Sequence, residues 1–384
     1  MNDESATTSR SDAGFLLSRR AFIVGAASVS ALGIGGAAMV FSRAAHAGTL
    51  LSAFEDVRGD QYVGGLHLEG RHVFGARVPM RAHGCAIDPH DPLRVVYFAR
   101  RPGTRAFEFD RATNTVRTAC DTPRGRHFAG HGVFSADGAW LFTPEHDYEN
   151  ARGVVAVRDA RTFAIAAEID TRGIDPHEVA WSPDRTRLVV ANGGILTHPR
   201  SYRDKLNIPT MDPSLCIIET ASGECIEQWR LPDHLLSIRH LAVAADGRVA
   251  VGLQYEGEPE HAPAIAALYR PGIGLELLPL PAAARVRSRG YVASIALSEP
   301  GDTIAAACPY GKGVACWSLA EGAFLDLIPA EETYGVSRLA DGALVASQRD
   351  GTLYTLNDGR SRSNFVTVDR DSPIRWDDHW TTVA

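Results

Sequence analysis

A motif of two short apolar strands joined by a polar turn recurs six times along the chain, and this repetition restricts the folds open to it. The copies occupy residues 85–99, 132–144, 178–192, 241–254, 295–309 and 336–348. Their turn aspartates, from Asp91 to Asp341, follow one another at intervals of 46, 47, 62, 56 and 39 residues. Asp-Gly and Pro-Asp turns of this kind close β-hairpins. The chain is therefore a series of hairpins rather than of helices.

Second hairpins lie between these copies, for example at residues 154–169 and 214–229. Each repeat then holds four short antiparallel strands, and four-stranded units at a period of about 40–50 residues are typical of a β-propeller. A further unit can be assembled from residues 62–78 and a C-terminal strand near residues 379–383, which would join the two ends of the ring. We therefore predict an all-β, seven-bladed propeller, with eight blades as the alternative.

The N-terminus carries the features of an export signal. Residues 18–23 contain a twin-arginine pattern, residues 23–41 form an uncharged segment rich in Gly and Ala, and residues 45–47 resemble a cleavage site. The apolar segment would also be long enough for a membrane-spanning helix, but its small residues and the cleavage motif favour a signal that is removed. We predict a twin-arginine (Tat) signal at residues 1–47, a single propeller domain at residues 48–384, and a location in the bacterial periplasm.

Charge and motifs argue against several classes of function. With a formal net charge of −7 and no basic tract after the signal, the chain is not expected to bind nucleic acid. It has no C-x-x-C or C-x-x-C-H motif, which argues against attached c-type haem and thioredoxin-like chemistry. A glycine-rich phosphate loop and a G-x-S-x-G nucleophile motif are absent from residues 48–384. With the signal removed, no membrane span is expected.

Two pairs of cysteines flank turns, Cys216 with Cys225 and Cys308 with Cys316. An oxidising compartment would allow each pair to form a disulfide. A bridge between directly opposed strands strains the preferred disulfide geometry, however, so we predict buried free thiols.

The antiparallel strand order gathers particular polar residues on one face of the propeller, because the start of a blade's first strand and the end of its second strand share that face. The first-strand starts carry His83, His131, His177 and His240. In the two later copies Ser294 and Tyr334 take this place. The second-strand ends carry Arg100, Arg101, Glu145, His146 and Asn192, with His198 beyond. We predict that one mouth of the central channel collects these side chains.

The spacing of the four histidines is uneven. His83 and His177 lie four residues before the central apolar residue of their strand, whereas His131 and His240 lie three before it. Because side chains alternate along a strand, all four can face the channel only where bulges or flared strand ends shift the register.

The alternative interpretation is that the histidines are structural. In WD-type propellers a Gly-His pair bonds to a turn aspartate of its own repeat, and Gly130-His131 with Asp137 fits this pattern superficially. Such a histidine normally precedes its strand by most of a loop rather than by three residues. The glycines around His127 and His131 also argue against a helix that would pair these two rings.

Neutral imidazoles with nearby carboxylates suit Fe, Cu or Zn, and outer-shell groups would fix each tautomer. The predicted metal ligands are His83, His131, His177, His240, Glu145 and His146. A neighbouring arginine pair suits an anionic ligand such as a carboxylate chelate. The predicted ligand-binding residues are Arg100, Arg101, His127, Glu178, Asn192, His198 and Arg239. For the arginine pair and the acidic loop at 145–149, a solvated rim is the alternative.

Several segments resemble a known family. They are GRHFAGHGVFSADG (125–138), DPHEVAWSPD (175–184), LVVANGGILTHP (188–199), KLNIPTMDPSL (205–215), SIRHLA (237–242) and ARRPGT (99–104). Together they are similar to a family of Tat-exported periplasmic propellers of unknown function. Members are typically encoded beside imelysin-type proteins and a di-haem thiol-oxidoreductase-like protein, in clusters linked to iron uptake. The resemblance, dense from His83 to Gln254, implies a propeller connected with iron acquisition and such partners, but no particular reaction.

The chain departs from the family pattern at two places. It has Pro144-Glu145-His146-Asp147 where the family tends to have Thr-Glu-Asn-Asp, which adds a candidate ligand. It has Cys308-Pro309-Tyr310-Gly311 where the family has a turn like Ser-Pro-Arg-Gly. The second change removes an arginine and puts a shared anion site there in doubt.

The first functional hypothesis is a periplasmic accessory protein of metal uptake that binds a metal ion or chelate at the channel mouth, with iron as the first candidate and copper as the second. It would exchange the metal with an imelysin-like or di-haem oxidoreductase partner. The second is a propeller enzyme, a lactonase or metal-dependent oxidoreductase, with Glu145 or Glu178 as base. The third is an interaction scaffold that docks a partner through residues 195–214. The fold itself does not choose among them.

Overall fold

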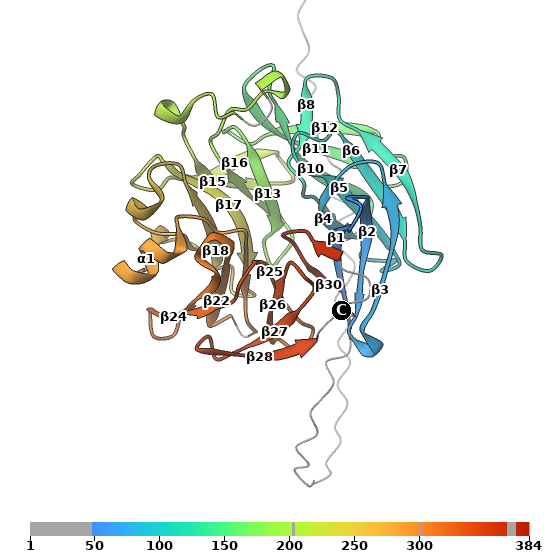
Figure 1. Cartoon of the computed structure of the whole chain (residues 1–384). Coiled ribbons are helices and arrows are strands. Elements are labelled where there is room, and N and C mark those ends of the chain that lie inside the picture. The colour runs from blue at the N-terminus through green and yellow to red at the C-terminus, as the bar shows by residue number, and fades with distance from the viewer. Residues whose placement is uncertain (1–47, 202–203, 300, 367–373, 384) are drawn as a thin grey trace, which may run out of the picture.

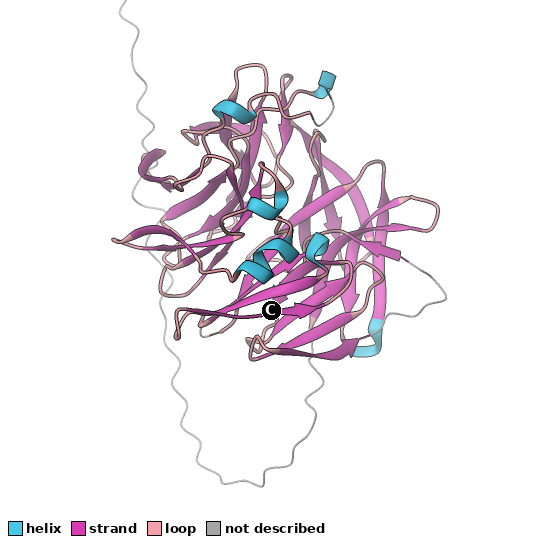
Figure 2. Cartoon of the chain, turned by 60° about the vertical axis from the view of Figure 1, so that its left-hand side comes forward, coloured by secondary structure: helices cyan, strands magenta, loops and turns pink. Residues whose placement is uncertain are grey.

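The computed structural model describes residues 48–201, 204–299, 301–366 and 374–383. The predicted export signal at residues 1–47 lies outside these residues. Within the described part of the chain, the strands form seven separate antiparallel sheets arranged as the blades of a ring (Figure 1). Strands make up most of the ordered structure, as Figure 2 shows. The prediction of a seven-bladed, all-β propeller is confirmed.

Blades 2 to 4 follow one another along the chain. Blade 2 consists of β4 (Ala82–Ile87), β5 (Arg94–Ala99), β6 (Arg105–Asp110) and β7 (Thr115–Asp121). Blade 3 consists of β8 (Arg126–Phe128), β9 (Val133–Phe134), β10 (Trp140–Asp147), β11 (Arg152–Asp159) and β12 (Ile165–Asp170). Blade 4 consists of β13 (Pro176–Trp181), β14 (Arg187–Asn192), β15 (Ser214–Glu219) and β16 (Glu224–Trp229).

Blades 5 to 7 repeat the same order. Blade 5 consists of β17 (Leu236–Val243), β18 (Val249–Tyr255), β19 (Ala266–Arg270) and β20 (Gly274–Leu277). Blade 6 consists of β21 (Ser294–Leu297), β22 (Thr303–Cys308), β23 (Gly313–Ser318) and β24 (Ala323–Pro329). Blade 7 consists of β25 (Thr333–Arg338), β26 (Leu344–Gln348), β27 (Leu353–Asn357) and β28 (Ser361–Val366).

Blade 1 closes the ring with both ends of the described chain. It combines β1 (Thr49–Asp56), β2 (Gln61–His67) and β3 (His72–Val78) with β29 (Ile374–Trp376) and β30 (Thr381–Val383). Both C-terminal strands pair with β1, with Phe54 opposite Trp376 and Leu51 opposite Thr381. Figure 1 shows the red C-terminal strand beside the blue N-terminal ones. The predicted closure near residues 379–383 is confirmed, while β1 is an additional strand that the repeat did not reveal.

Helices are confined to connections between strands. They are α1 (Ala282–Ser288) and the 3-10 turns η1 (Glu69–Arg71), η2 (Pro199–Ser201), η3 (Ile208–Thr210), η4 (Pro259–His261) and η5 (Pro309–Gly311). No helix in the described ranges is long and apolar enough to cross a membrane.

Apolar faces of adjacent blades pack against each other and form the core. Val189 and Ala191 of β14, for example, share a buried cluster with Val251 and Leu253 of β18. Seven such clusters of buried apolar residues occur among the described residues. Because burial of apolar surface is the main favourable term in folding, each blade depends on its neighbours.

The innermost strands are irregular at the positions of the predicted histidines. The pairing register shifts between Ala82 and Cys85 in blade 2, and between Ile238 and His240 in blade 5. Blade 4 has the same irregularity on either side of His177. In blade 3 the innermost strand is interrupted at 129–132, between β8 and β9. These irregularities compensate for the uneven spacing of the histidines, because a bulge re-aims a side chain.

The prediction of free thiols is wrong for one pair. Cys216 and Cys225 form a disulfide, with their Cα atoms 6.2 Å apart. A register shift after Ile217 places Cys225 opposite Ile218, so the two cysteines are diagonal rather than directly opposed, within bridging distance. Cys308 and Cys316 are buried and free in the described structure, as predicted.

Candidate functional site: a five-histidine centre

Among the described residues, five imidazole rings from five consecutive blades meet in the central channel. They are His379 of blade 1, His83 of blade 2, His131 of blade 3, His177 of blade 4 and His240 of blade 5. The centroids of neighbouring rings lie 4.4–6.1 Å apart. We call this set the five-histidine centre. The structure brings together the four histidines that the sequence placed at one channel mouth and adds His379, which it did not.

The centre lies inside the protein rather than at an open mouth. His83, His131 and His240 are only 3%, 7% and 3% exposed. His177 and His379 are half-buried. Burial lowers the pKa of His83 to about 4 and the pKa of His131 and His240 to about 3. It also lowers the pKa of the other two rings well below the usual range. All five rings are therefore neutral at neutral pH, which is the form that binds metals.

A carboxylate fixes the tautomer of two of the rings. The Nδ1 atom of His83 donates to Asp377 Oδ1 at 2.6 Å. Burial alone would raise the pKa of Asp377, but His83 and two arginines hold it well below its usual range, so the group is ionised. The Nδ1 atom of His240 is likewise 3.1 Å from Glu178 Oε2. Both rings then keep a free lone pair on Nε2, the arrangement that commonly supports metal-binding histidines.

His177 carries its proton on the other nitrogen. Arg239 Nη1 lies 3.0 Å from Nδ1 of His177. A guanidinium group can only donate, so Nδ1 accepts and Nε2 keeps the proton in the neutral ring. In this arrangement His177 offers no free lone pair.

Each of the remaining two rings has a buried nitrogen without a hydrogen-bond partner. Nε2 of His131 and Nε2 of His379 are buried and have no hydrogen-bond partner among the described residues. Buried polar atoms in native proteins are nearly always satisfied by protein, water or an ion, so each of these atoms is free to bind a water molecule or an ion.

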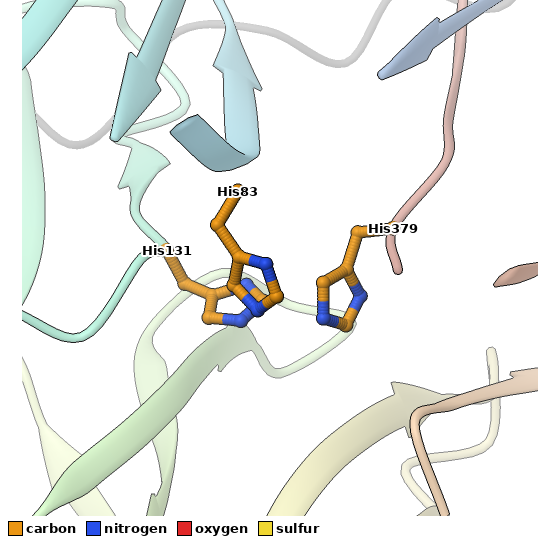
Figure 3. Close-up of side chains that lie close together, drawn as sticks. All are labelled: His83, His131 and His379. Atoms are coloured by element: carbon orange, nitrogen blue, oxygen red, sulfur yellow. The ribbon is translucent and has the colours of Figure 1, made fainter. Parts of the chain in front are cut away.

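Three groups of described residues could hold a metal ion. They are His83, His131 and His379; His131, His177 and His240; and His83, Asp377 and Asp378. Within each group one ligand atom per residue lies within 4.8 Å of the others. Figure 3 shows the rings of the first group turned toward one another from separate parts of the fold. This group fits a metal best, because it contains three rings with no guanidinium bonded to them.

The third group is already neutralised by arginines. Arg81 Nε lies 2.5 Å from Asp377, and Arg100 Nη1 lies 3.0 Å from Asp378. A cation there would have to displace both guanidinium groups.

These arginines belong to a larger set, which we call the arginine–aspartate cap. It consists of Arg81, Arg100, Arg101, Arg239, Asp175, Asp377 and Asp378. Arg101 pairs with Asp175 at 2.7 Å, and Arg239 reaches the same carboxylate at 3.3 Å. The predicted ligand-binding residues Arg100, Arg101 and Arg239 thus hold carboxylates of the protein itself. An anionic ligand would have to compete with these pairs.

Glu145 and His146 lie apart from the centre, contrary to their predicted place among its ligands. Glu145 is fully buried and accepts a hydrogen bond from Arg158 Nη2 at 2.6 Å. His146 lies opposite His127 on neighbouring strands, with ring centroids 5.1 Å apart. Both residues belong to the second strand of blade 3, which stands one strand away from the channel. Sharing a face of the propeller therefore does not bring their side chains to its axis.

Three other predicted residues also make separate contacts. Asn192 donates to the Thr171 carbonyl at 2.8 Å. His198 contacts the Tyr148 ring at a centroid distance of 4.9 Å, and His127 Nδ1 lies 3.0 Å from its neighbouring carbonyl at Phe128. Glu178 is the remaining predicted residue, and it does reach the centre through His240.

The contacts of Asp137 do not support the interpretation of His131 as a structural histidine of the WD type. Asp137, the turn aspartate that would bind it in a WD-type repeat, instead accepts from Ser135 Oγ at 2.6 Å and Ala139 N at 3.1 Å.

Two glycines allow His83 and His131 to approach each other. A Cβ on Gly84 would lie 2.9 Å from Nδ1 of His131, and a Cβ on Gly130 would lie 2.7 Å from Cδ2 of His83. Gly130 also has a positive φ of 105°, which disfavours any side chain. Blades 2 and 3 therefore meet through glycine backbone at the centre.

We expect Gly130→Ala to destabilise the protein by about 1 kcal/mol or more, because it combines backbone strain with the His83 clash. Gly272→Ala is the matched control, since Gly272 has a φ of 74° with nothing within 4 Å of its Cβ position. Denaturant unfolding of both variants measures the difference. Equal destabilisation would contradict the role assigned to the glycine contact.

The buried rings also predict how stability depends on pH. In the metal-free protein we expect the free energy of unfolding to fall as the pH is lowered from 6.5 to about 4. In this window the histidines of the unfolded chain bind protons while the folded ones resist them, so acid favours unfolding; above it their contribution is constant. Chemical denaturation across the window, with a chelator present, measures the slope. His131→Phe should reduce it, and an unchanged slope would contradict the prediction.

Solved structures of other proteins resemble this fold at low sequence identity. A chain of Kuenenia stuttgartiensis hydrazine synthase matches with a TM-score of 0.55 and 16% identity, over 88% of this chain and 100% of that one. A chain in the crystal structure of the mitotic checkpoint complex matches with a TM-score of 0.53 and 11% identity, over 91% and 90%. These similarities concern the fold alone. No curated protein matches the sequence significantly. A family model described as "Protein of unknown function (DUF1513)" matches residues 76–383.

Proposed function

The chain belongs to this family of proteins of unknown function, since the match extends over most of its length, and we propose that its five-histidine centre binds one first-row transition-metal ion. The observation that carries the proposal is the pair of buried Nε2 atoms on His131 and His379, which have no partner among the described residues. They lie beside His83, whose Nε2 lone pair is kept free by Asp377.

The donor set favours particular metals. Neutral imidazoles suit iron, copper, zinc and nickel, whereas calcium and magnesium prefer oxygen ligands. We propose iron as the first candidate and copper as the second. The choice of iron is supported by the resemblance to a family connected with iron uptake rather than by the donor set.

The burial of the centre favours a bare ion over a metal chelate. His83, His131 and His240 are almost inaccessible, and the arginines expected to hold a chelating anion are paired with Asp175 and Asp378. The proposed ligand is therefore the ion itself.

We further propose that the protein acts in the periplasm as an accessory of iron uptake, with an imelysin-like or di-haem oxidoreductase protein as its partner. The twin-arginine pattern at residues 18–23 and the family resemblance support this placement. Both are properties of the sequence and are independent of the geometry of the centre.

An enzyme remains the second candidate because of Glu178. This residue lines a cavity beside the centre, and burial raises its pKa, which suits a general base. Glu145 does not suit that role, because it is held by Arg158 inside blade 3. Turnover of lactones, or metal-dependent oxidation that Glu178→Gln abolishes, would favour the enzyme over a carrier.

We expect purified protein stripped of metal to bind one equivalent of Fe²⁺ or Cu²⁺, and His131→Ala to weaken binding by at least the ~10–100-fold typical of losing a supporting contact. The control is His198→Ala, since His198 is a partly exposed histidine outside the centre. Anaerobic calorimetric titration and elemental analysis measure both. The proposal is wrong if no stoichiometric metal binds, or if His131→Ala and His379→Ala together leave binding unchanged.

Asp377→Asn tests the supporting carboxylate separately. The amide has no charge with which to hold the Nδ1 proton of His83, so we expect metal affinity to fall by ~10–100-fold. Asp121→Asn, which changes a half-exposed aspartate paired with Arg105, should have no effect. Competition with a chelator of known affinity gives the comparison, and equal affinity of the two variants would remove Asp377 from the site.

A further inference from the structure

The centre has two unlike sides along the channel. On one side stand the residues at the beginnings of the innermost strands and the ends of the second strands, including the arginine–aspartate cap. On the other side the innermost strands continue past the histidines and surround a cavity of about 410 Å³. A cation approaching the centre would meet different groups on the two sides.

The cap side carries more positive than negative groups. Among the described residues it contains four guanidinium groups and three carboxylates, tied to one another in ion pairs. Asp175, Asp377 and Asp378 are each at most 4% exposed. A cation approaching from this side would meet guanidinium groups first and would have to separate buried ion pairs.

The cavity side is open and leads directly to the centre. Its lining includes His131 and His379, the two rings with unsatisfied Nε2 atoms. Small residues keep it wide, among them Gly84, Gly132, Ala180, Ala242 and Ala296. His131 and His379 are the rings of the centre that border this cavity, so an ion in the cavity lies next to the centre without having passed the cap.

Glu178 is the single carboxylate in the cavity lining, counting the described residues. Its side chain is 19% exposed, and its Oε2 atom accepts from Nδ1 of His240 and from the Leu241 amide at 3.3 Å. It therefore touches both the cavity and the centre. The one cationic side chain in the lining, Arg338, is already paired with Glu299 at 2.5 Å.

We propose that the metal ion enters and leaves the five-histidine centre through this cavity, and that Glu178 is the positioning carboxylate that attracts it toward the imidazoles. The proposal rests on the metal site proposed above. The metal would then be exchanged at the face of the propeller where Arg338 and Glu299 are exposed. It would not pass through the opposite face, which carries the arginine–aspartate cap and the 195–214 insertion.

The contribution of Glu178 is tested by the rate of metal binding. Metal-free protein is mixed with Cu²⁺ in a stopped-flow instrument, and quenching of Trp181 and Trp380, which line the cavity, reports arrival of the ion. We expect Glu178→Gln to slow association by about 10-fold and to reduce its dependence on ionic strength, as loss of electrostatic attraction predicts. Glu178→Asp should restore most of the rate. A purely structural role would leave the salt dependence unchanged.

The route is tested by obstruction. Ala242→Phe places a ring in the cavity. We expect this ring to slow both association and dissociation of the metal by about 10-fold. Because a barrier slows both directions equally, the equilibrium affinity should stay close to that of the parent protein. Ala242→Ser is the matched control at the same position and should behave like the parent. Circular dichroism confirms that both variants are folded.

Equilibrium binding on the same samples separates the two claims. If the parent binds metal but neither Ala242→Phe nor Glu178→Gln changes the rates, the channel route is wrong and the centre stands. If the parent binds no metal at equilibrium, the centre itself is wrong and the route falls with it.

Discussion

The hydrogen bond between His83 and Asp377 joins the closure of the ring to the chemistry of its channel. Asp377 lies between β29 and β30, the two strands that pair with β1 and hold the chain ends together. The same short segment supplies His379, whose carbonyl accepts from Ser52 Oγ of β1 at 2.7 Å. One stretch of chain therefore closes the propeller, supplies one ring of the centre and orients another. A defect in closure and a defect in the site would be difficult to separate by mutation elsewhere in blade 1.

Burial explains why these rings form a chemically special set. A neutral imidazole inside a protein normally satisfies both nitrogens, and a buried polar atom without a partner costs about 1–3 kcal/mol. The centre leaves Nε2 unsatisfied on His131 and on His379. A set of structural histidines would be expected to bond to each other or to carbonyls instead. Here the rings pack largely edge to face, and the carboxylates and Arg239 bind the outer nitrogens. The ring nitrogens without a partner lie close to one another in the middle of the centre, where one ion would bind several of them at once.

The sequence predicted the fold and four fifths of the centre because both follow from one repeated pattern. The four histidines that it found lie in or beside the innermost strands, His83 and His177 near a strand start, and the uneven spacing showed that bulges would be needed to turn all four inward. His379 was missed for lack of a repeat at the C-terminus, yet it is the first residue of the strand predicted at 379–383 to close the ring, so the same rule applied there would have found it. The prediction that Glu145 and His146 belong to the centre was wrong, because residues on the same face of the propeller can lie at different distances from its axis. Asp377 left no recognisable signal, since its partner lies 294 residues away.

The two blades without a histidine explain why the centre is one-sided. Blade 6 presents Ser294, which bonds to the Val336 carbonyl of blade 7 at 3.2 Å. Blade 7 presents Gly335, where a Cβ would lie only 2.3 Å from the indole of Trp380. This indole donates to Ser347 Oγ at 2.6 Å, so it fills the space beside blade 7 that a sixth imidazole would need. Trp380 follows His379 directly, and its anchoring in blade 7 fixes the backbone from which the His379 ring turns toward blades 2 and 3. The asymmetry of the ring thus positions His379, the one imidazole of the centre that the repeat did not supply.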